Sequence, residues 1–304
     1  MDNLTHTLFG ATLARTPLGR AGRGALPALL IASNAPDVDI VAAFGGGTKT
    51  YLEWHRGPTH GPIGVVALGL ATAGLVWLGR TAIDRKWPRR DASEPSSADA
   101  SFVMLASVSM IGVILHVLMD LPTSYGTRLL SPFSWRWFAF DWLPIIDIYL
   151  MMALAAGLVL GELTKASRRR IAAIVLALMA ANYGVRAVAH AHAVTLAPQL
   201  FGPRFGEPCN PETATVDRAL AAWPRPNGSA ASTSGRTCLV EVAAVPTFMS
   251  PFRWRVIAQL SNAYEIQDVD VVQLITVRQL RDDAPSKRRH ERRNGRDFDE
   301  ARPS

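Results

Sequence analysis

The chain has 304 residues, of which 49% are hydrophobic, and it carries a formal net charge of +7 at pH 7. This length exceeds one average domain, and the hydrophobic fraction is only modestly above globular values. The apolar residues are gathered into long runs, however, with too little polar chain between them to cover a soluble bundle. The basic residues lie in short loops and in the tail, so nucleic-acid binding is the least favoured function.

Four runs have the length and composition of membrane-spanning helices. They are residues 61–79, 101–119, 144–161 and 171–189. Each run is about 20 residues long, which matches a hydrocarbon core of roughly 30 Å. The sequence therefore predicts a mainly α-helical, polytopic transmembrane bundle.

Two shorter apolar segments precede these runs. Residues 4–14 and 24–33 are joined by a short basic turn. We expect a helical hairpin packed inside the bundle, where protein rather than lipid surrounds its polar groups. Residues 34–60, which are rich in Gly and Pro, predict a loop.

The distribution of basic residues predicts the orientation in the membrane. The loop 80–100 contains five basic residues and the turn 162–170 contains four, whereas the loop 121–143 contains two. Positively charged loops tend to stay in the cytoplasm. We therefore expect a multi-pass membrane protein, with residues 34–60 and the chain after His190 on the exterior face.

The chain divides by composition into a membrane domain, an irregular proline-rich linker, a small β-rich module outside the membrane, and a charged tail that we expect to be disordered. These units are residues 1–192, 193–237, 238–280 and 281–304. Within the module we expect strands at 238–247, 252–260 and 262–280, from alternating polarity and β-branched residues. In an oxidising exterior, Cys209 and Cys238 could equally form a disulfide or remain separate.

His116 and Asp120 are the strongest pair of candidate metal ligands. Because they are four residues apart on a predicted helix, their side chains project from one face. The same spacing lets two histidines of one helix bind a single zinc ion. A carboxylate near the membrane is costly and needs a partner or a task. The alternative is a buried hydrogen bond between the two side chains that holds helices together.

Further residues with ligand chemistry fall on the same predicted membrane face. They are His6, Asp37, Asp39, His55 and His60. Each alone has a structural alternative, since acids form turns and a lone histidine is commonly hydrogen-bonded in a core. With His116 and Asp120, however, they match the nitrogen and oxygen ligands of zinc, with manganese and iron as competitors. We therefore predict an open divalent-metal site that could hold more than one ion.

Such a site would polarise an ester or phosphoryl oxygen and generate hydroxide near neutral pH. Arg56 could neutralise a phosphate-like group through a bidentate contact, or contact a lipid headgroup instead. Asp39 or Asp120 would be the general base if it were not fully bound to metal. The predicted catalytic residues are therefore Asp39, Arg56 and Asp120.

Four ordered motifs resemble those of the YdjM-like (LexA-regulated) membrane-bound metal-dependent hydrolases. The motifs are Thr5-His6, Pro36-Asp37-Val38-Asp39, His55-Arg56-Gly57-Pro58-Thr59-His60-Gly61 and His116-Val117-Leu118-Met119-Asp120. The resemblance is close over about residues 1–150, and Pro251-Phe252-Arg253-Trp254-Arg255 resembles a segment of longer members. It implies metal-dependent hydrolysis in a prokaryotic inner membrane, where the exterior face is periplasmic, and it leaves the substrate open. One departure is Gly61, where a serine usually follows the second histidine.

Two functions follow from these patterns. The first is a membrane hydrolase that cleaves a phosphoester or related ester of a membrane lipid or small molecule at the outer face. The second is a non-catalytic membrane scaffold with a structural metal site and an exterior module that binds a protein partner.

Overall fold

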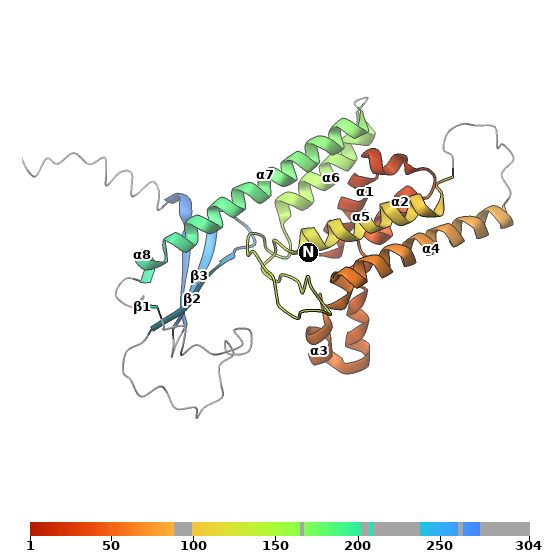
Figure 1. Ribbon diagram of the computed structural model, residues 1–304. Helices are drawn as coiled ribbons and strands as arrows, with labels where there is room; N and C mark the ends of the chain where they lie inside the picture. The colour runs from red at the N-terminus through yellow and green to blue at the C-terminus, as the bar shows by residue number, and fades with distance from the viewer. Residues whose placement is uncertain (88–98, 165–166, 202–206, 209–237, 261–263, 274–304) are drawn as a thin grey trace, which may run out of the picture.

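The computed structural model shows a set of packed helices followed by a small β-sheet (Figure 1). It describes residues 1–87, 99–164, 167–201, 207–208, 238–260 and 264–273. The fold class predicted from the sequence, a helical transmembrane bundle with a β-rich C-terminal module, is confirmed.

The described elements have the following bounds. The helices are α1 (Asn3–Leu13), α2 (Ala25–Ala32), α3 (Ala42–Trp54), α4 (Pro62–Lys86), α5 (Phe102–Asp120), α6 (Ile148–Leu163), α7 (Arg168–Thr195) and α8 (Ala197–Phe201). Short 3-10 helices between them are η1 (Pro17–Ala21), η2 (Ala35–Val41) and η3 (Pro58–His60). The strands are β1 (Glu207–Pro208), β2 (Cys238–Pro246), β3 (Arg253–Leu260) and β4 (Tyr264–Asp270).

Within the described residues, α4, α5 and α7 are long and apolar enough to cross a membrane, and α6 is a shorter apolar helix of 16 residues. These four helices correspond to the four predicted spans. α6 begins at Ile148 rather than at residue 144, because the Asp147 carboxylate caps it by accepting the Leu150 N–H at 3.0 Å. The bundle therefore combines three full-length spans with one short one.

The predicted N-terminal hairpin is present as α1 and α2, joined by η1. α1 packs against α2 and α6, while α2 packs against α4 and α5. Gly112 permits the close approach of α5 to α2, because a Cβ at this position would lie 2.8 Å from the Cβ of Ala32. Ala28 and Leu29 are completely buried. The hairpin therefore brings the end of α2 against α5.

The loop prediction for residues 34–60 was wrong. Most of this segment is helical and consists of η2, α3 and η3. The glycines that suggested a loop lie inside α3, where Gly47 has φ 70° and ψ −167° and interrupts the helix. A glycine adopts this left-handed backbone at little cost, so helical turns on both sides of the break are retained.

The C-terminal sheet packs on the end of α7. Its strand order is β1-β2-β3-β4, with β2, β3 and β4 antiparallel and β1 parallel to β2. On one face of β3, Trp254, Val256 and Ala258 are buried, and they share a core with Ala189 and Ala193 of α7. One helix thus runs from the membrane bundle into the module (Figure 1).

The predicted strands 238–247 and 252–260 are confirmed as β2 and β3. The third predicted strand, 262–280, is shorter than expected, because β4 ends at Asp270 and residues 271–273 are helical. The Asp270 carboxylate accepts hydrogen bonds from two of the backbone N–H groups that follow it. This local capping ends the strand.

Other predictions for this region remain untested. Residues 274–280, the tail 281–304 and Cys209 of the candidate disulfide lie outside the described residues. α7 continues to Thr195, and α8 follows it within the segment expected to be a linker. The division into four units, with its three boundaries, remains a prediction.

Polar contacts connect α6 with α7 and with the module. Nε of Arg186 lies 2.7 Å from Oδ2 of Asp147, and both side chains are fully buried. Asn182, one turn earlier in α7, donates to the same carboxylate oxygen at 3.2 Å. Tyr149 of α6 donates to the carbonyl of Met249, between β2 and β3, at 3.1 Å. These contacts hold the module against the bundle.

We expect Asp147→Asn to destabilise the protein by about 3–5 kcal/mol, because it leaves a buried guanidinium without a counter-charge. Asparagine keeps the size and the capping oxygen of the aspartate, so the variant measures the effect of removing the negative charge alone. Thermal unfolding in detergent measures the effect. The double variant Asp147→Asn/Arg186→Met should recover most of the loss, and an unchanged melting temperature for the single variant would contradict this account.

Candidate metal centre

Four side chains from three segments meet at one end of the bundle. They are Asp37 of η2, His60 of η3, and His116 and Asp120 of α5. One ligand atom from each lies within 4.8 Å of those from the others. The Asp37 side chain is 10% exposed, and the other three are completely buried. We refer to these residues as the four-residue cluster.

The backbone around His60 is fixed by close packing. Gly61 caps α4 in an extended conformation, and a Cβ there would lie 1.8 Å from the carbonyl oxygen of Ser131. Ser131 belongs to the irregular segment between α5 and α6, and its Oγ would lie 2.8 Å from the same Cβ. A serine at position 61 would therefore collide with this segment, which explains the glycine as a packing requirement of this chain.

Hydrogen bonds assign the protonated nitrogen of both cluster histidines. His116 Nδ1 lies 2.8 Å from the carbonyl oxygen of Ser33, which only accepts, so Nδ1 carries the proton. Thr59 donates its hydroxyl proton to Asp39 at 3.2 Å and lies 3.0 Å from His60 Nδ1. Because that proton is already used, the hydroxyl accepts from His60 Nδ1. Each neutral imidazole therefore presents the lone pair of Nε2.

These lone pairs face each other beside carboxylates. The two Nε2 atoms are 3.3 Å apart, and Oδ2 of Asp120 lies 3.4 Å from each of them. Oδ1 of Asp37 lies 3.6 Å from His116 Nε2. Among the described residues, Oδ2 of Asp37 and of Asp120 make no hydrogen bond. Four electron-pair donors thus converge in a buried space, and a metal ion is the partner that this donor set fits.

Burial sets the protonation of two cluster residues, His60 and Asp37. It lowers the pKa of His60 well below its usual range, which keeps the imidazole neutral as a metal ligand requires. Burial also raises the pKa of Asp37, since the charged carboxylate loses its water. A bound cation would offset this effect and favour the ionised form.

His6 lies beside the four-residue cluster. Its ring stacks on that of His116 with centroids 3.8 Å apart, and its Nε2 lies 3.3 Å from Oδ1 of Asp120. Neither ring nitrogen has a hydrogen-bond partner among the described residues. The Met1 amino group also contacts Oδ1 of Asp120. The Asp120 carboxylate therefore faces His6 with one oxygen and the other two histidines with the second.

Asp39 and His55 form a second pair outside the cluster. Oδ1 of Asp39 lies 2.9 Å from His55 Nδ1, and Oδ2 accepts the backbone N–H of Arg56 at 2.7 Å. With the Thr59 hydroxyl, both carboxylate oxygens are engaged. His55 is 13% exposed and packs against the rings of Tyr51 and Tyr125. Asp39 thus orients His55 and, through Thr59, supports His60.

Arg56 is built into the site rather than free in solvent. It adopts a left-handed backbone with φ 53°, and its Nε lies 3.2 Å from Oδ2 of Asp120. One terminal nitrogen donates to Thr123 Oγ1 at 3.1 Å and to the Gly126 carbonyl at 3.0 Å. The Tyr125 ring lies 5.0 Å from the guanidinium carbon. Burial lowers the pKa of Arg56, while the nearby Asp37 carboxylate opposes this shift.

Sequence reasoning missed residues that position the ligands. Thr59 lies within the predicted histidine motif. A hydroxyl between His55 and His60 could have indicated a hydrogen-bond partner for one of these imidazoles. Ser33 contributes only a backbone carbonyl, which leaves no trace in side-chain chemistry. Thr123 and Gly126 hold Arg56 from a segment far away in the chain.

The family model for the YdjM inner membrane protein matches residues 1–193. The chain belongs to the YdjM inner membrane protein family. This confirms the resemblance found in the sequence, and the match includes every residue of the four-residue cluster. A relative from Bacillus subtilis (strain 168), "Uncharacterized protein YfhP", is 26% identical over 166 residues, which are 52% of this chain and 45% of the relative. The alignment thus spans less than half of that relative, and no solved structure matches the chain.

We expect His116→Ala to remove most of the metal from the purified YdjM-family protein, because loss of one of four ligands opens the site. His192→Ala is the matched control, since this histidine lies on α7 outside the cluster. Elemental analysis of detergent-purified protein measures the metal-to-protein ratio. Equal metal content in both variants would show that the cluster does not bind the ion.

Proposed function

We propose that this YdjM-family protein is a membrane-embedded hydrolase that uses a divalent metal, most simply zinc, to cleave a phosphoester or related ester. The observation that supports this proposal is the convergence of two imidazole lone pairs and two carboxylates within 4.8 Å. Asp37, His60, His116 and Asp120 would hold the ion, with His6 next to them for a second one. When bound, the ion would supply Lewis acidity and acidify water for attack on the ester.

The remaining residues would position the substrate and move protons. Arg56 places a cation beside Asp120, where it would stabilise negative charge that develops on a phosphoryl or acyl oxygen. Asp39 fixes Nδ1 of His55, so the other nitrogen of this partly exposed imidazole is available as a proton acceptor. A carboxylate that orients a histidine is a recurrent arrangement in general base catalysis. We therefore assign proton transfer to the Asp39–His55 pair.

The surroundings of the site favour a lipid substrate. Trp54 is the last residue of α3, directly before His55, and Trp135 packs against it with ring centroids 6.1 Å apart. Both side chains are 49% exposed, and the nearby Phe133 is 76% exposed. Exposed aromatic side chains of this kind are enriched where a protein meets the membrane–water boundary. We propose that an ester group of a membrane lipid reaches the site at this level.

A structural metal site remains the second candidate, and the complete burial of His60, His116 and Asp120 favours it. In that case the protein would be a membrane scaffold whose module binds a partner. Metal removal would then lower thermal stability, and no ester would be cleaved. The two proposals differ in the expected role of His55. This side chain binds Asp39, and among the described residues it makes no hydrogen bond to the four-residue cluster, so only the enzymatic proposal gives it a role in the reaction.

We propose further that the cluster and the C-terminal module face the periplasm. Lys49 of α3 is 88% exposed on the side of the cluster, whereas Arg169 is exposed at the start of α7. In a background with both native cysteines replaced by serine, a membrane-impermeant maleimide should label Lys49→Cys in intact cells. It should label Arg169→Cys only after the membrane is opened. The reverse pattern would place the site in the cytoplasm.

We expect the double variant His60→Ala/Asp120→Ala to insert into the membrane and to lose hydrolysis of phosphodiester and phospholipid substrates. His55→Ala should keep its metal and lose rate by about 100-fold or more, since proton transfer by a positioned base contributes this much. Activity is followed by release of product from a panel of esters, with His192→Ala as the matched control. Undiminished hydrolysis in the double variant, or none with the metal-loaded wild type, would refute the enzymatic proposal.

A further inference from the structure

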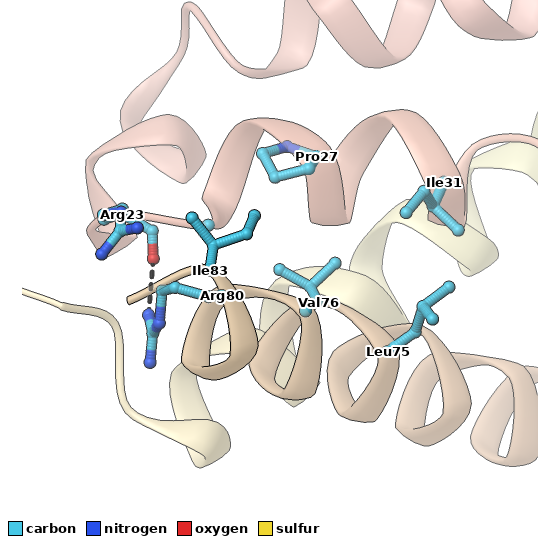
Figure 2. A pocket seen from close by; sticks show the side chains of 9 residues that line it. Arg23, Pro27, Ile31, Leu75, Val76, Arg80 and Ile83 are labelled. Carbon is cyan, nitrogen blue, oxygen red and sulfur yellow. Dashed lines mark hydrogen bonds between the residues drawn. The ribbon is translucent and has the colours of Figure 1, made fainter. Parts of the chain in front are cut away.

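A groove of about 340 Å³ lies between α2 and α4, at the end of α4 opposite to the metal centre (Figure 2). Leu75, in its lining, is 13 residues along α4 from Pro62, which corresponds to about 20 Å of helix. The volume falls within the range of sites that bind small molecules, about 300–1,000 Å³. The groove is therefore separate from the four-residue cluster.

The walls of the groove are apolar. Pro27 and Ile31 of α2 face Leu75 and Ile83 of α4 across it (Figure 2). Leu75 is 59% exposed and Ile83 is 52% exposed, although α4 is a membrane-spanning candidate. In a membrane these side chains meet hydrocarbon rather than water. The chemistry of the groove therefore suits an acyl chain.

One end of the groove is cationic. Figure 2 shows Arg23 and Arg80 together at the end away from Ile31 and Leu75. Arg80 donates to the Arg23 carbonyl at 2.8 Å and to the Ala100 carbonyl at 3.0 Å. Carbonyl oxygens hold the guanidinium in place without neutralising its charge.

Acidic residues at this end do not cancel the positive charge. Arg23 forms a bidentate ion pair with Asp84, in which its two terminal nitrogens lie 2.7 and 2.8 Å from the carboxylate oxygens. One of these nitrogens also lies 3.5 Å from Oδ1 of Asp99. Residues 20–23, 80–87 and 99–100 together contain five cations and these two carboxylates. Positive charge at the boundary of a membrane attracts anionic lipid.

From these observations we propose that the groove is a binding site for one anionic phospholipid. Its phosphate lies at the Arg23–Arg80 end, and the first part of one acyl chain lies between α2 and α4. From Arg80 to Leu75 the groove follows five residues of α4, or about 7–8 Å. A groove of this length holds the part of the acyl chain next to the glycerol. That part is the most fixed in position relative to the headgroup. The proposal does not depend on metal binding or hydrolysis.

Two glycines of α4 provide a matched test. Gly79 lines the groove, whereas Gly74 does not, and a Cβ added at either position would have no atom within 4 Å. Each variant replaces a glycine in the interior of α4 by leucine. Because leucine favours an isolated helix by about 1 kcal/mol relative to glycine, both variants should fold. Only Gly79→Leu places a side chain in the groove.

Native mass spectrometry of the full chain in mild detergent measures retained phospholipid. We expect the wild type and Gly74→Leu to keep one phospholipid and Gly79→Leu to lose it. In nanodiscs that contain phosphatidylglycerol and phosphatidylcholine with identical acyl chains, the retained lipid should favour phosphatidylglycerol by about fivefold. Arg80→Gln should weaken this preference, and Arg169→Gln, at an exposed arginine outside the groove, should preserve it.

Three results would overturn the proposal. Equal lipid retention by the two glycine variants would show that the groove is not the site. Equal retention of the two lipid classes would remove the role of the arginines. A change in oligomeric state confined to Gly79→Leu would show that a second copy of the chain occupies the groove.

Discussion

The constraint on which this structure depends is that several electron-pair donors, two imidazole nitrogens and a carboxylate oxygen, are buried close together. His60 and His116 each use Nδ1 to bind a neighbouring oxygen, so their Nε2 lone pairs are left 3.3 Å apart. Asp120 adds a carboxylate oxygen 3.4 Å from both. Such groups repel one another in a medium that excludes water, unless a cation lies between them. A bound metal ion would turn this local repulsion into an attraction that holds three segments together.

The rest of the bundle positions these donors. α5 supplies His116 and Asp120 one turn apart, and its close approach to α2 at Gly112 brings the Ser33 carbonyl to His116. Asp39 binds the backbone of the segment that carries His55 and His60, while Arg56 connects this segment to residues 123–126. Membrane helices, 3-10 turns and an irregular segment therefore share one polar network. A change in any of these contacts would alter the ligand geometry without touching the ion.

The sequence predicted the membrane spans because apolar composition and length are set by the bilayer itself. It also predicted the pairing of His116 with Asp120, since helical spacing places them on one face whatever surrounds the helix. It failed for residues 34–60, because a glycine inside α3 interrupts the helix without abolishing its flanking turns. The sequence did not distinguish the four-residue cluster from the Asp39–His55 pair. That distinction depends on which oxygen atoms are already occupied by the Arg56 N–H and the Thr59 hydroxyl, and no sequence pattern contains this information.

An X-ray absorption spectrum of the metal-loaded, detergent-solubilised protein is the most direct test of the central claim. The account predicts nitrogen and oxygen donors at about 2.0–2.2 Å from zinc, with the multiple-scattering signature of at least two imidazoles. A spectrum with sulfur donors, or one without imidazole scattering, would contradict the assignment of His60 and His116 as ligands of a shared ion.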